Sequence, residues 1–124
     1  MGQSNSDIGR AGEFLAAYIL ETHGVEVHHV DRAGADLWCK VQDSLLTVQV
    51  KSRSKVSTEK NRRPHYRFST QKTTADWYCF VALDRRLLLM YPVSQFSMKT
   101  ARFSEGEFNA DHQRRTIEEM LQSC

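Results

Sequence analysis

Three polar residues on two successive strand-like stretches could together carry out chemistry on a phosphate. Residues 34–41 and 45–51 each alternate between polar and apolar side chains, which is typical of strands with two different faces. On one face lie Asp36 of the first stretch and Gln49 and Lys51 of the second. An acid, an amide and an ammonium group gathered on one face could hold a divalent cation and stabilise a phosphate.

Whether these side chains meet depends on the register of the hairpin, because a slip of one residue turns every side chain over. A two-residue loop at 43–44 and a four-residue loop over 42–45 both put Asp36 opposite Lys51. A three-residue loop would instead put Asp36 opposite Val50. Matching the apolar faces of the two strands favours the first register, in which the polar side chains converge.

A magnesium site is one use for this face, since Mg²⁺ takes oxygen ligands and keeps several waters. The Asp36 carboxylate, the Gln49 side-chain oxygen and the Val50 carbonyl could be ligands. Lys51 beside them could lower the pKa of an attacking water or hold a phosphate oxygen. The same spacing also fits a cross-strand salt bridge between Asp36 and Lys51, worth roughly a few tenths of a kcal/mol. Spacing alone favours this simpler role.

The arrangement resembles the catalytic core of the PD-(D/E)XK nuclease superfamily, in which an Asp on one strand and a (D/E)-x-K on the next hold the metal. The Gly-x-x-Gly-Glu at residues 9–13 looks like the first-helix motif of its small members. These are the archaeal-type Holliday junction resolvases and the small group I intron homing endonucleases of this fold. The resemblance covers roughly residues 9–92, and its later stretches, 66–68, 75–78 and 90–92, are most similar to the homing branch.

The resemblance implies a restriction-endonuclease-like α/β fold and Mg²⁺-dependent hydrolysis of DNA, with Mn²⁺ as a substitute, by a homodimer or higher homo-oligomer. Asp36, Gln49 and the Val50 carbonyl would hold the metal, and Lys51 would assist the nucleophilic water. Glu13, an ordinary surface acid by helix spacing alone, would help through a water. The sequence departs from the family pattern in two ways. Gln49 replaces the usual acid, and no helix pattern follows Lys51.

A basic segment follows the proposed catalytic strand directly. Residues 51–67 hold seven basic side chains against one acid, Glu59, so that this segment carries +6 in a chain whose net charge is +2. A charge run is usually only a solvated surface, but its position after Lys51 favours contact with DNA phosphates. The candidate nucleic-acid contacts are Arg10 of the first-helix motif and Arg53, Lys55, Lys60, Arg62, Arg63 and Arg67.

The remaining elements must position these groups within one domain of 124 residues. After a polar, mobile start over 1–6, Asp7 is expected to cap a helix over 8–23. Strands are expected at 25–30, in the hairpin, around 65–68, at 77–83 as a central strand, and at 87–91. A basic loop over 52–64, a helical turn over 93–98 and a final helix capped by Asn109 or Asp111 complete the expected fold. The expected architecture is an α/β fold with a mixed central sheet flanked by helices.

The cysteines and the lack of long apolar runs indicate the cellular setting. Cys39 and Cys79 lie within strand patterns and are expected to be buried as small hydrophobic residues. An odd count of three, with no paired spacing, fits a reducing intracellular compartment better than a disulfide scaffold. Without a signal peptide or a membrane-length apolar run, we expect a soluble cytoplasmic protein with no membrane partner.

The sequence is compatible with three functions. A junction resolvase would recognise branched DNA by shape through its phosphates, and the compact size favours this leading hypothesis. A homing or restriction-type endonuclease would read base edges, which the stretches over 66–92 favour. The third is a nucleic-acid-binding module that has lost catalysis, with Gln49 as the trace of that loss.

Overall fold

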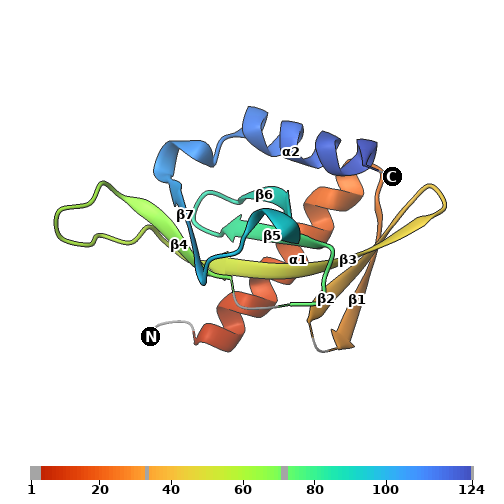
Figure 1. The fold of residues 1–124 in the computed structure, drawn as a ribbon, viewed down its shortest axis with the longest axis horizontal. Coiled ribbons are helices and arrows are strands. Elements are labelled where there is room, and N and C mark those ends of the chain that lie inside the picture. The colour runs from red at the N-terminus through yellow and green to blue at the C-terminus, as the bar shows by residue number, and fades with distance from the viewer. Residues whose placement is uncertain (1–3, 33, 71–72, 124) are drawn as a thin grey trace.

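The computed structural model of the chain describes residues 4–32, 34–70 and 73–123, without the side chains of 31 and 32 (Figure 1). The elements, in order, are α1 (Asn5–Thr22), β1 (Glu26–Arg32), β2 (Ala35–Val41), β3 (Ser44–Arg53), β4 (His65–Ser69), β5 (Trp77–Ala82), β6 (Leu87–Pro92), η1 (Val93–Gln95), β7 (Thr100–Ser104), η2 (Glu105–Glu107) and α2 (Ala110–Gln122). None of the helices in these ranges is long and apolar enough to span a membrane.

Two sheets form the centre of the fold. Five strands make a mixed sheet in the order β1-β2-β3-β5-β6, in which β3 and β5 run parallel and the other neighbours antiparallel. β4 and β7 form a separate two-stranded antiparallel sheet, which we call the β4–β7 ribbon. The predicted mixed α/β fold is therefore confirmed, whereas β7 was missing from the sequence-based expectation.

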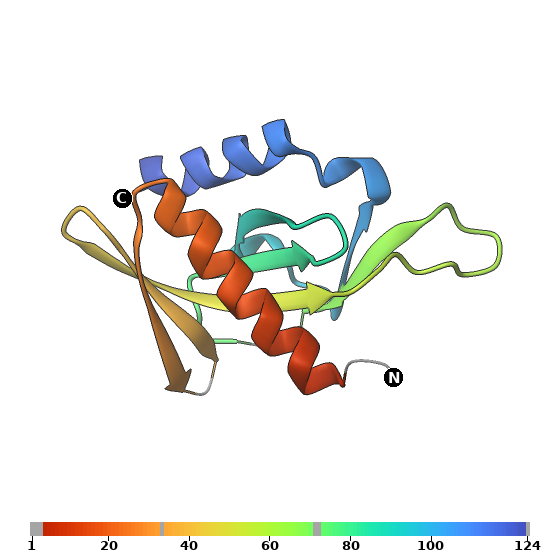
Figure 2. The same cartoon turned by 180° about the vertical axis from the view of Figure 1, so that it is seen from behind.

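The strand β5 shows how the layers are built, because all six of its side chains are buried. Trp77, Cys79 and Val81 join the cluster that includes α1, and the intervening Tyr78 and Phe80 join the aromatic cluster beneath the β4–β7 ribbon. Figure 2 shows α1 crossing the sheet in front of β3 and β5. One face of the sheet is thus covered by a helix and the other by the ribbon. The predicted central strand is confirmed.

The helix α2 lies along the open edge of β6 (Figure 1). The backbone N–H of Leu88 donates to Gln113 Oε1 at 2.9 Å, and that of Met90 donates to Thr116 Oγ1 at 3.0 Å. These side chains satisfy donors that an edge strand would otherwise expose for pairing with another chain. Both predicted helices therefore flank the sheet, and α2 begins after Asn109, one of its two predicted caps.

Two predicted boundaries near the site are wrong. Ser4, not Asp7, caps α1, because Ser4 and the Asp7 three residues later form a reciprocal capping box that starts the helix at Asn5. The predicted mobile start therefore becomes helical from Asn5, and residues 1–3 lie outside the described chain. The basic loop begins later than residue 52, since β3 continues in parallel pairing with β5 as far as Arg53.

Candidate active site

The register of the β2–β3 hairpin places Asp36 beside Gln49. The turn consists of residues 42–43, with Gln42 in the left-handed region at φ 55°, so that Val41 pairs with Ser44 and Leu37 with Val48. Continuing this register brings Asp36 opposite Gln49 rather than Lys51. The predicted register is thus wrong by two residues, because the turn lies one residue earlier than expected. Its parity is correct, which keeps the polar residues on one face.

The Asp36 carboxylate forms hydrogen bonds with β3 at the end of this strand pair. Its Oδ2 accepts the backbone N–H of Val50 at 2.8 Å and the Gln49 side-chain amide at 3.3 Å. Because the N–H and C=O of one strand residue point to the same side, the Val50 carbonyl also faces the Asp36 side of β3. The other carboxylate oxygen, Oδ1, forms no hydrogen bond with any described residue. The three predicted metal ligands therefore lie together.

Glu13 of α1 reaches the same place from another layer. An open cleft of about 730 Å³ is lined by Glu13 and Asp36, with Ser6, Gly9, Arg10, Phe14, His29 and Val30 completing its walls. Helix spacing predicted an ordinary surface acid, whereas the structure makes Glu13 a half-buried side chain in the wall of the cleft. The first-helix motif and the strand acid are therefore brought together.

Gly12 sets how closely α1 approaches β3. A Cβ atom at Gly12 would lie 1.7 Å from Ser52 Oγ and 2.7 Å from Ser52 Cβ, so only glycine fits between helix and strand. A Cβ at Gly9 would meet no described atom within 4 Å, and this residue lines the cleft instead. The close approach of helix and strand therefore depends on Gly12, whereas Gly9 leaves room in the cleft.

His29 is a cleft residue that the sequence did not single out. Its ring lies 4.9 Å from that of Phe14, whereas the adjacent His28 points elsewhere and contacts Glu26 at 3.0 Å. Adjacent strand residues point to opposite faces, but nothing in the local pattern indicates which of the two histidines faces the site.

Thr73 is the second residue that sequence reasoning missed. Its Oγ1 lies 2.9 Å from Gln49 Oε1 and 2.7 Å from the carbonyl oxygen of Gly34. Gly34 has φ +83°, and a Cβ there would come within 2.6 Å of Thr74 Oγ1. Glycine at this position therefore allows the segment 73–75 to pack against β2 and β3. No sequence signal links Thr73 to Gln49.

Lys51 lies two residues beyond Gln49 on the same face of β3 and is half-buried. Its ammonium group forms no hydrogen bond or ion pair with the described part of the chain. The predicted pairing of Lys51 with Asp36 is therefore wrong, because Gln49 occupies that position in the register. The Lys51 ammonium group is therefore available to a ligand that binds next to Gln49 on β3.

The donor set at this site suits a hard cation with a large share of water ligands. Within the described ranges no three His, Cys, Asp or Glu side chains gather around a common point. A cation would depend on Asp36, the neutral oxygens of Gln49 and Val50, and water, with Glu13 across the cleft. Mg²⁺ is commonly bound in this way, through one or two carboxylates and several waters.

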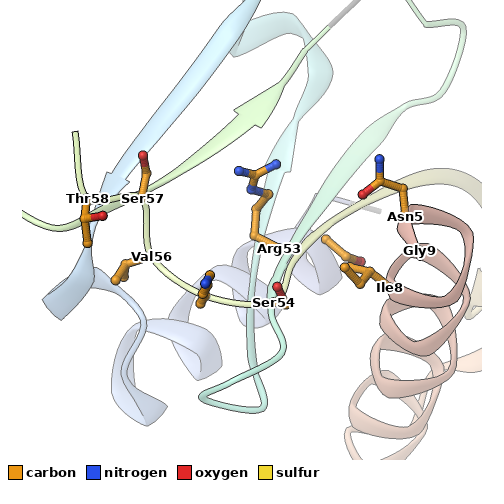
Figure 3. A pocket seen from close by; sticks show the side chains of 10 residues that line it. Asn5, Ile8, Gly9, Arg53, Ser54, Val56, Ser57 and Thr58 are labelled. Atoms are coloured by element: carbon orange, nitrogen blue, oxygen red, sulfur yellow. The ribbon is translucent and has the colours of Figure 1, made fainter. Parts of the chain in front are cut away.

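A second cleft begins where β3 ends. It lies between the start of α1 and residues 52–58, and Figure 3 shows Asn5 projecting from the helix and Arg53 from the strand. Gly9 lines this cleft as well as the one with Glu13 and Asp36, so the two clefts adjoin. The exposed Arg53 and Lys55 have no partner among the described residues. Two of the predicted phosphate-contacting residues, Arg53 and Lys55, thus lie next to the cleft that holds Glu13 and Asp36.

Glu59 divides the other predicted basic contacts into two groups. It lies 3.5 Å from both Arg62 Nε and Arg67 Nη1, whereas Lys60 and Arg63 are exposed without a partner in the described structure. Arg10 lies over the Phe14 ring at 5.8 Å. Glu59 therefore offsets part of the charge of Arg62 and Arg67, whereas Lys60 and Arg63 remain available to a polyanion.

The β4–β7 ribbon adds cations that the sequence did not predict. Arg67 and Arg102 are directly opposite in the ribbon, and both are exposed. Like charges at such positions destabilise a strand pair, which an anion lying across them would reverse. Lys99 joins Arg53 and Arg67 around a further hollow. Because β7 itself was not predicted, Lys99 and Arg102 were missed with it.

Cys39 and Cys79 are core residues and do not line the site. Cys39 and Cys79 are fully buried, as predicted. Burial raises the pKa of the Cys39 thiol to about 12. It also raises the pKa of the Cys79 thiol well above its usual range, with smaller contributions from Cys39 and Asp36. Both thiols are therefore protonated at neutral pH and serve as packing groups.

Comparison with known proteins identifies the fold. No protein-family model and no curated protein sequence matches the chain. A solved structure of a bacterial homing endonuclease, I-Ssp6803I, is similar with a TM-score of 0.74 at 21% sequence identity. The match covers 99% of this chain and 94% of that one. The mixed sheet, its two helices and the ribbon therefore make up a homing-endonuclease-like fold.

Proposed function

We propose that this chain is a Mg²⁺-dependent endonuclease that hydrolyses DNA phosphodiester bonds, with Mn²⁺ able to replace Mg²⁺. One observation carries the proposal: Asp36, which lines a cleft together with Glu13, contacts Gln49 and the Val50 backbone where β2 and β3 stop pairing. A basic surface adjoins this cleft. The similarity of the fold to a bacterial homing endonuclease supports the same function.

Asp36, Gln49 and the Val50 carbonyl would hold the metal. A bound Mg²⁺ supplies Lewis-acid stabilisation of the phosphate and lowers the pKa of a bound water. The Asp36 carboxylate keeps lone pairs for this role, because its Oδ1 forms no hydrogen bond with the described residues. Its Oδ2 accepts from Val50 and Gln49, and a turn of the Gln49 amide would free one of its lone pairs for a cation.

The other side chains act on the water and the DNA. The Lys51 ammonium, which has no partner among the described residues, would donate to a phosphate oxygen or orient the attacking water. Glu13 would hold a second water from across the cleft. The phosphates on either side would contact Arg53 and Lys55 directly, with Arg10, Lys60, Arg62, Arg63 and Arg67 extending the contact surface.

The β4–β7 ribbon favours a sequence-reading enzyme over a junction resolvase. Its outer face presents Arg67 and Ser69 from β4 and Arg102 and Ser104 from β7, all exposed. A two-stranded ribbon fits the major groove of DNA, where arginine and hydroxyl groups distinguish base pairs. Recognition of a junction by shape would need only phosphate contacts. We therefore place the homing-type function first and the resolvase second.

Cleavage of both strands implies a homodimer or higher assembly, because one cleft acts on one strand at a time. Light scattering of the chain with and without duplex DNA would determine its mass in solution. A monomer in both states would limit the enzyme to nicking.

A cleavage assay on supercoiled plasmid, linear duplex and four-way junction DNA tests the function. We expect Mg²⁺-dependent cleavage that Asp36→Asn and Lys51→Ala each abolish, since such groups contribute several kcal/mol to the barrier. Asp43→Asn, in the exposed hairpin turn, is the matched control and should cut normally. Circular dichroism would establish that each variant is folded.

Each outcome distinguishes one candidate. Cutting confined to the four-way junction would support the resolvase, and cutting at a defined duplex site would support the homing-type enzyme. DNA binding without cleavage at any Mg²⁺ concentration would identify a binding module. Wild-type rates in folded Asp36→Asn protein would place the active site elsewhere.

A further inference from the structure

The hydrogen bonds around Thr73 cannot all exist at once. Its Oγ1 accepts the backbone N–H of Ala75 at 3.2 Å and lies within donating distance of two oxygens, Gly34 O at 2.7 Å and Gln49 Oε1 at 2.9 Å. A hydroxyl group carries one proton and two acceptor lone pairs. Since both oxygens only accept, the single Thr73 proton leaves one of these short contacts without a hydrogen bond.

Turning the Gln49 amide by 180° removes this conflict, because its nitrogen and oxygen exchange places and have nearly equal size. The Thr73 proton then goes to Gly34, and its two lone pairs accept from Ala75 N–H and from Gln49 Nε2. Every group around Thr73 is satisfied in this arrangement.

The turned amide changes what faces Asp36. The Gln49 oxygen would take the place of Nε2, which lies 3.3 Å from Asp36 Oδ2. Two acceptor oxygens at this separation repel each other unless a cation lies between them. Neighbouring ligands of an octahedral Mg²⁺, with bonds of about 2.1 Å, are roughly 3 Å apart. The pair of oxygens thus has nearly the spacing that the cation requires.

We propose that Thr73 is a positioning residue that turns the Gln49 amide oxygen toward the metal. This inference rests on the proposed metal-dependent function. Without the cation, the Gln49 NH₂ group donates to Asp36; with it, the same NH₂ group donates to Thr73. Gly34 makes this possible by letting the segment 73–75 approach the strands. A carboxylate at position 49 would present an oxygen on either side and would need no such orientation.

Binding of Mn²⁺ to the full chain, measured by electron paramagnetic resonance without DNA, tests the inference. Thr73→Val removes the hydroxyl at equal size, and Thr73→Ser retains it as the control. We expect Thr73→Val to weaken Mn²⁺ affinity by about 10–100-fold, the usual cost of losing a group that orients a ligand. Thr73→Ser should bind nearly as wild type.

The same substitution in a Gln49→Glu background separates orientation from packing. If Thr73 orients the amide, Thr73→Val should weaken Mn²⁺ binding much less beside Glu than beside Gln. An equal loss in both backgrounds would overturn the proposal and show that the hydroxyl only holds the segment 73–75 against Gly34. In ¹⁵N-labelled wild-type protein, Mg²⁺ should shift the Gln49 side-chain NH₂ resonances, and in Thr73→Val this shift should be absent at the same concentration.

The remaining outcomes distinguish this proposal from the function on which it rests. Unchanged Mn²⁺ affinity in folded Thr73→Val, with metal-dependent cleavage by the wild type, would overturn the role of Thr73 alone. A wild-type chain that binds no Mn²⁺ and needs no metal to cut DNA would overturn both.

Discussion

The two glycines of the first-helix motif should respond oppositely to the same substitution. Both lie inside α1, where alanine is favoured over glycine by about 1 kcal/mol. Gly9→Ala adds its methyl group where, beyond the adjoining residues and backbone of its own helix, no described atom lies within 4 Å. Gly12→Ala adds it 1.7 Å from Ser52 Oγ and 2.7 Å from Ser52 Cβ. The first contact could be relieved by a rotamer change, but the second requires α1 and β3 to move apart.

The magnitude follows from comparing the two variants. The helix-propensity gain is common to both, so the difference in their free energies of unfolding reports the overpacking at Gly12, about 1–3 kcal/mol. Gly9→Ala should be more stable than wild type by roughly 0.5–1 kcal/mol, and Gly12→Ala should be less stable. For a domain of this size, each kcal/mol corresponds to a melting-temperature change of about 4 °C.

Thermal and urea unfolding of the two variants provide the measurement. Adding Ser52→Gly to Gly12→Ala removes both clashing atoms and should recover part of the lost stability. Cleavage should fall in Gly12→Ala, because moving α1 away from β3 also moves Glu13 away from Asp36. If Gly12→Ala unfolds at or above the temperature of Gly9→Ala, the close helix–strand contact does not constrain this fold and the reasoning fails.

Three further predictions address metal, DNA and pH. Gln49→Glu should lower the Mg²⁺ concentration for half-maximal cleavage and Gln49→Leu should raise it, since a carboxylate is the stronger ligand; an unchanged requirement in Gln49→Leu would mean that Gln49 only packs. Replacing Arg62 and Arg63 with Ala should lower the log–log salt slope of duplex binding by up to about 1.8, against no change for Arg114→Ala on α2. The pKa of the Cys39 thiol is raised from 9.0 to about 12, so the unfolded state loses its proton first as pH rises. Between pH 9 and about 12 this thiol should therefore lower the free energy of unfolding by about 1.4 kcal/mol per pH unit, and Cys39→Ala should remove this contribution while leaving that of Cys79.

Local patterns in the sequence were sufficient to predict these strands and which of their side chains share a face. Alternation over 34–41 and 45–51 predicted which side chains share a face, and the apolar run over 77–83 predicted a strand buried on both sides, observed as β5. The composition around residues 51–67 predicted the basic surface. Each of these features depends on neighbours within a few residues, which is the range over which strand and helix periodicity act.

The tertiary structure decided which of these side chains meet. The turn at residues 42–43 shifted the register by two and made Gln49, not Lys51, the neighbour of Asp36. The packing of α1 on β3 through Gly12 brought Glu13 into the cleft, and the docking of residues 73–75 on Gly34 brought Thr73 to Gln49. β7 and its Arg102 emerged only from pairing with β4. These contacts join residues far apart in the chain, and they form because closing the two layers buries the aromatic and aliphatic clusters together, a requirement that no short stretch of sequence carries.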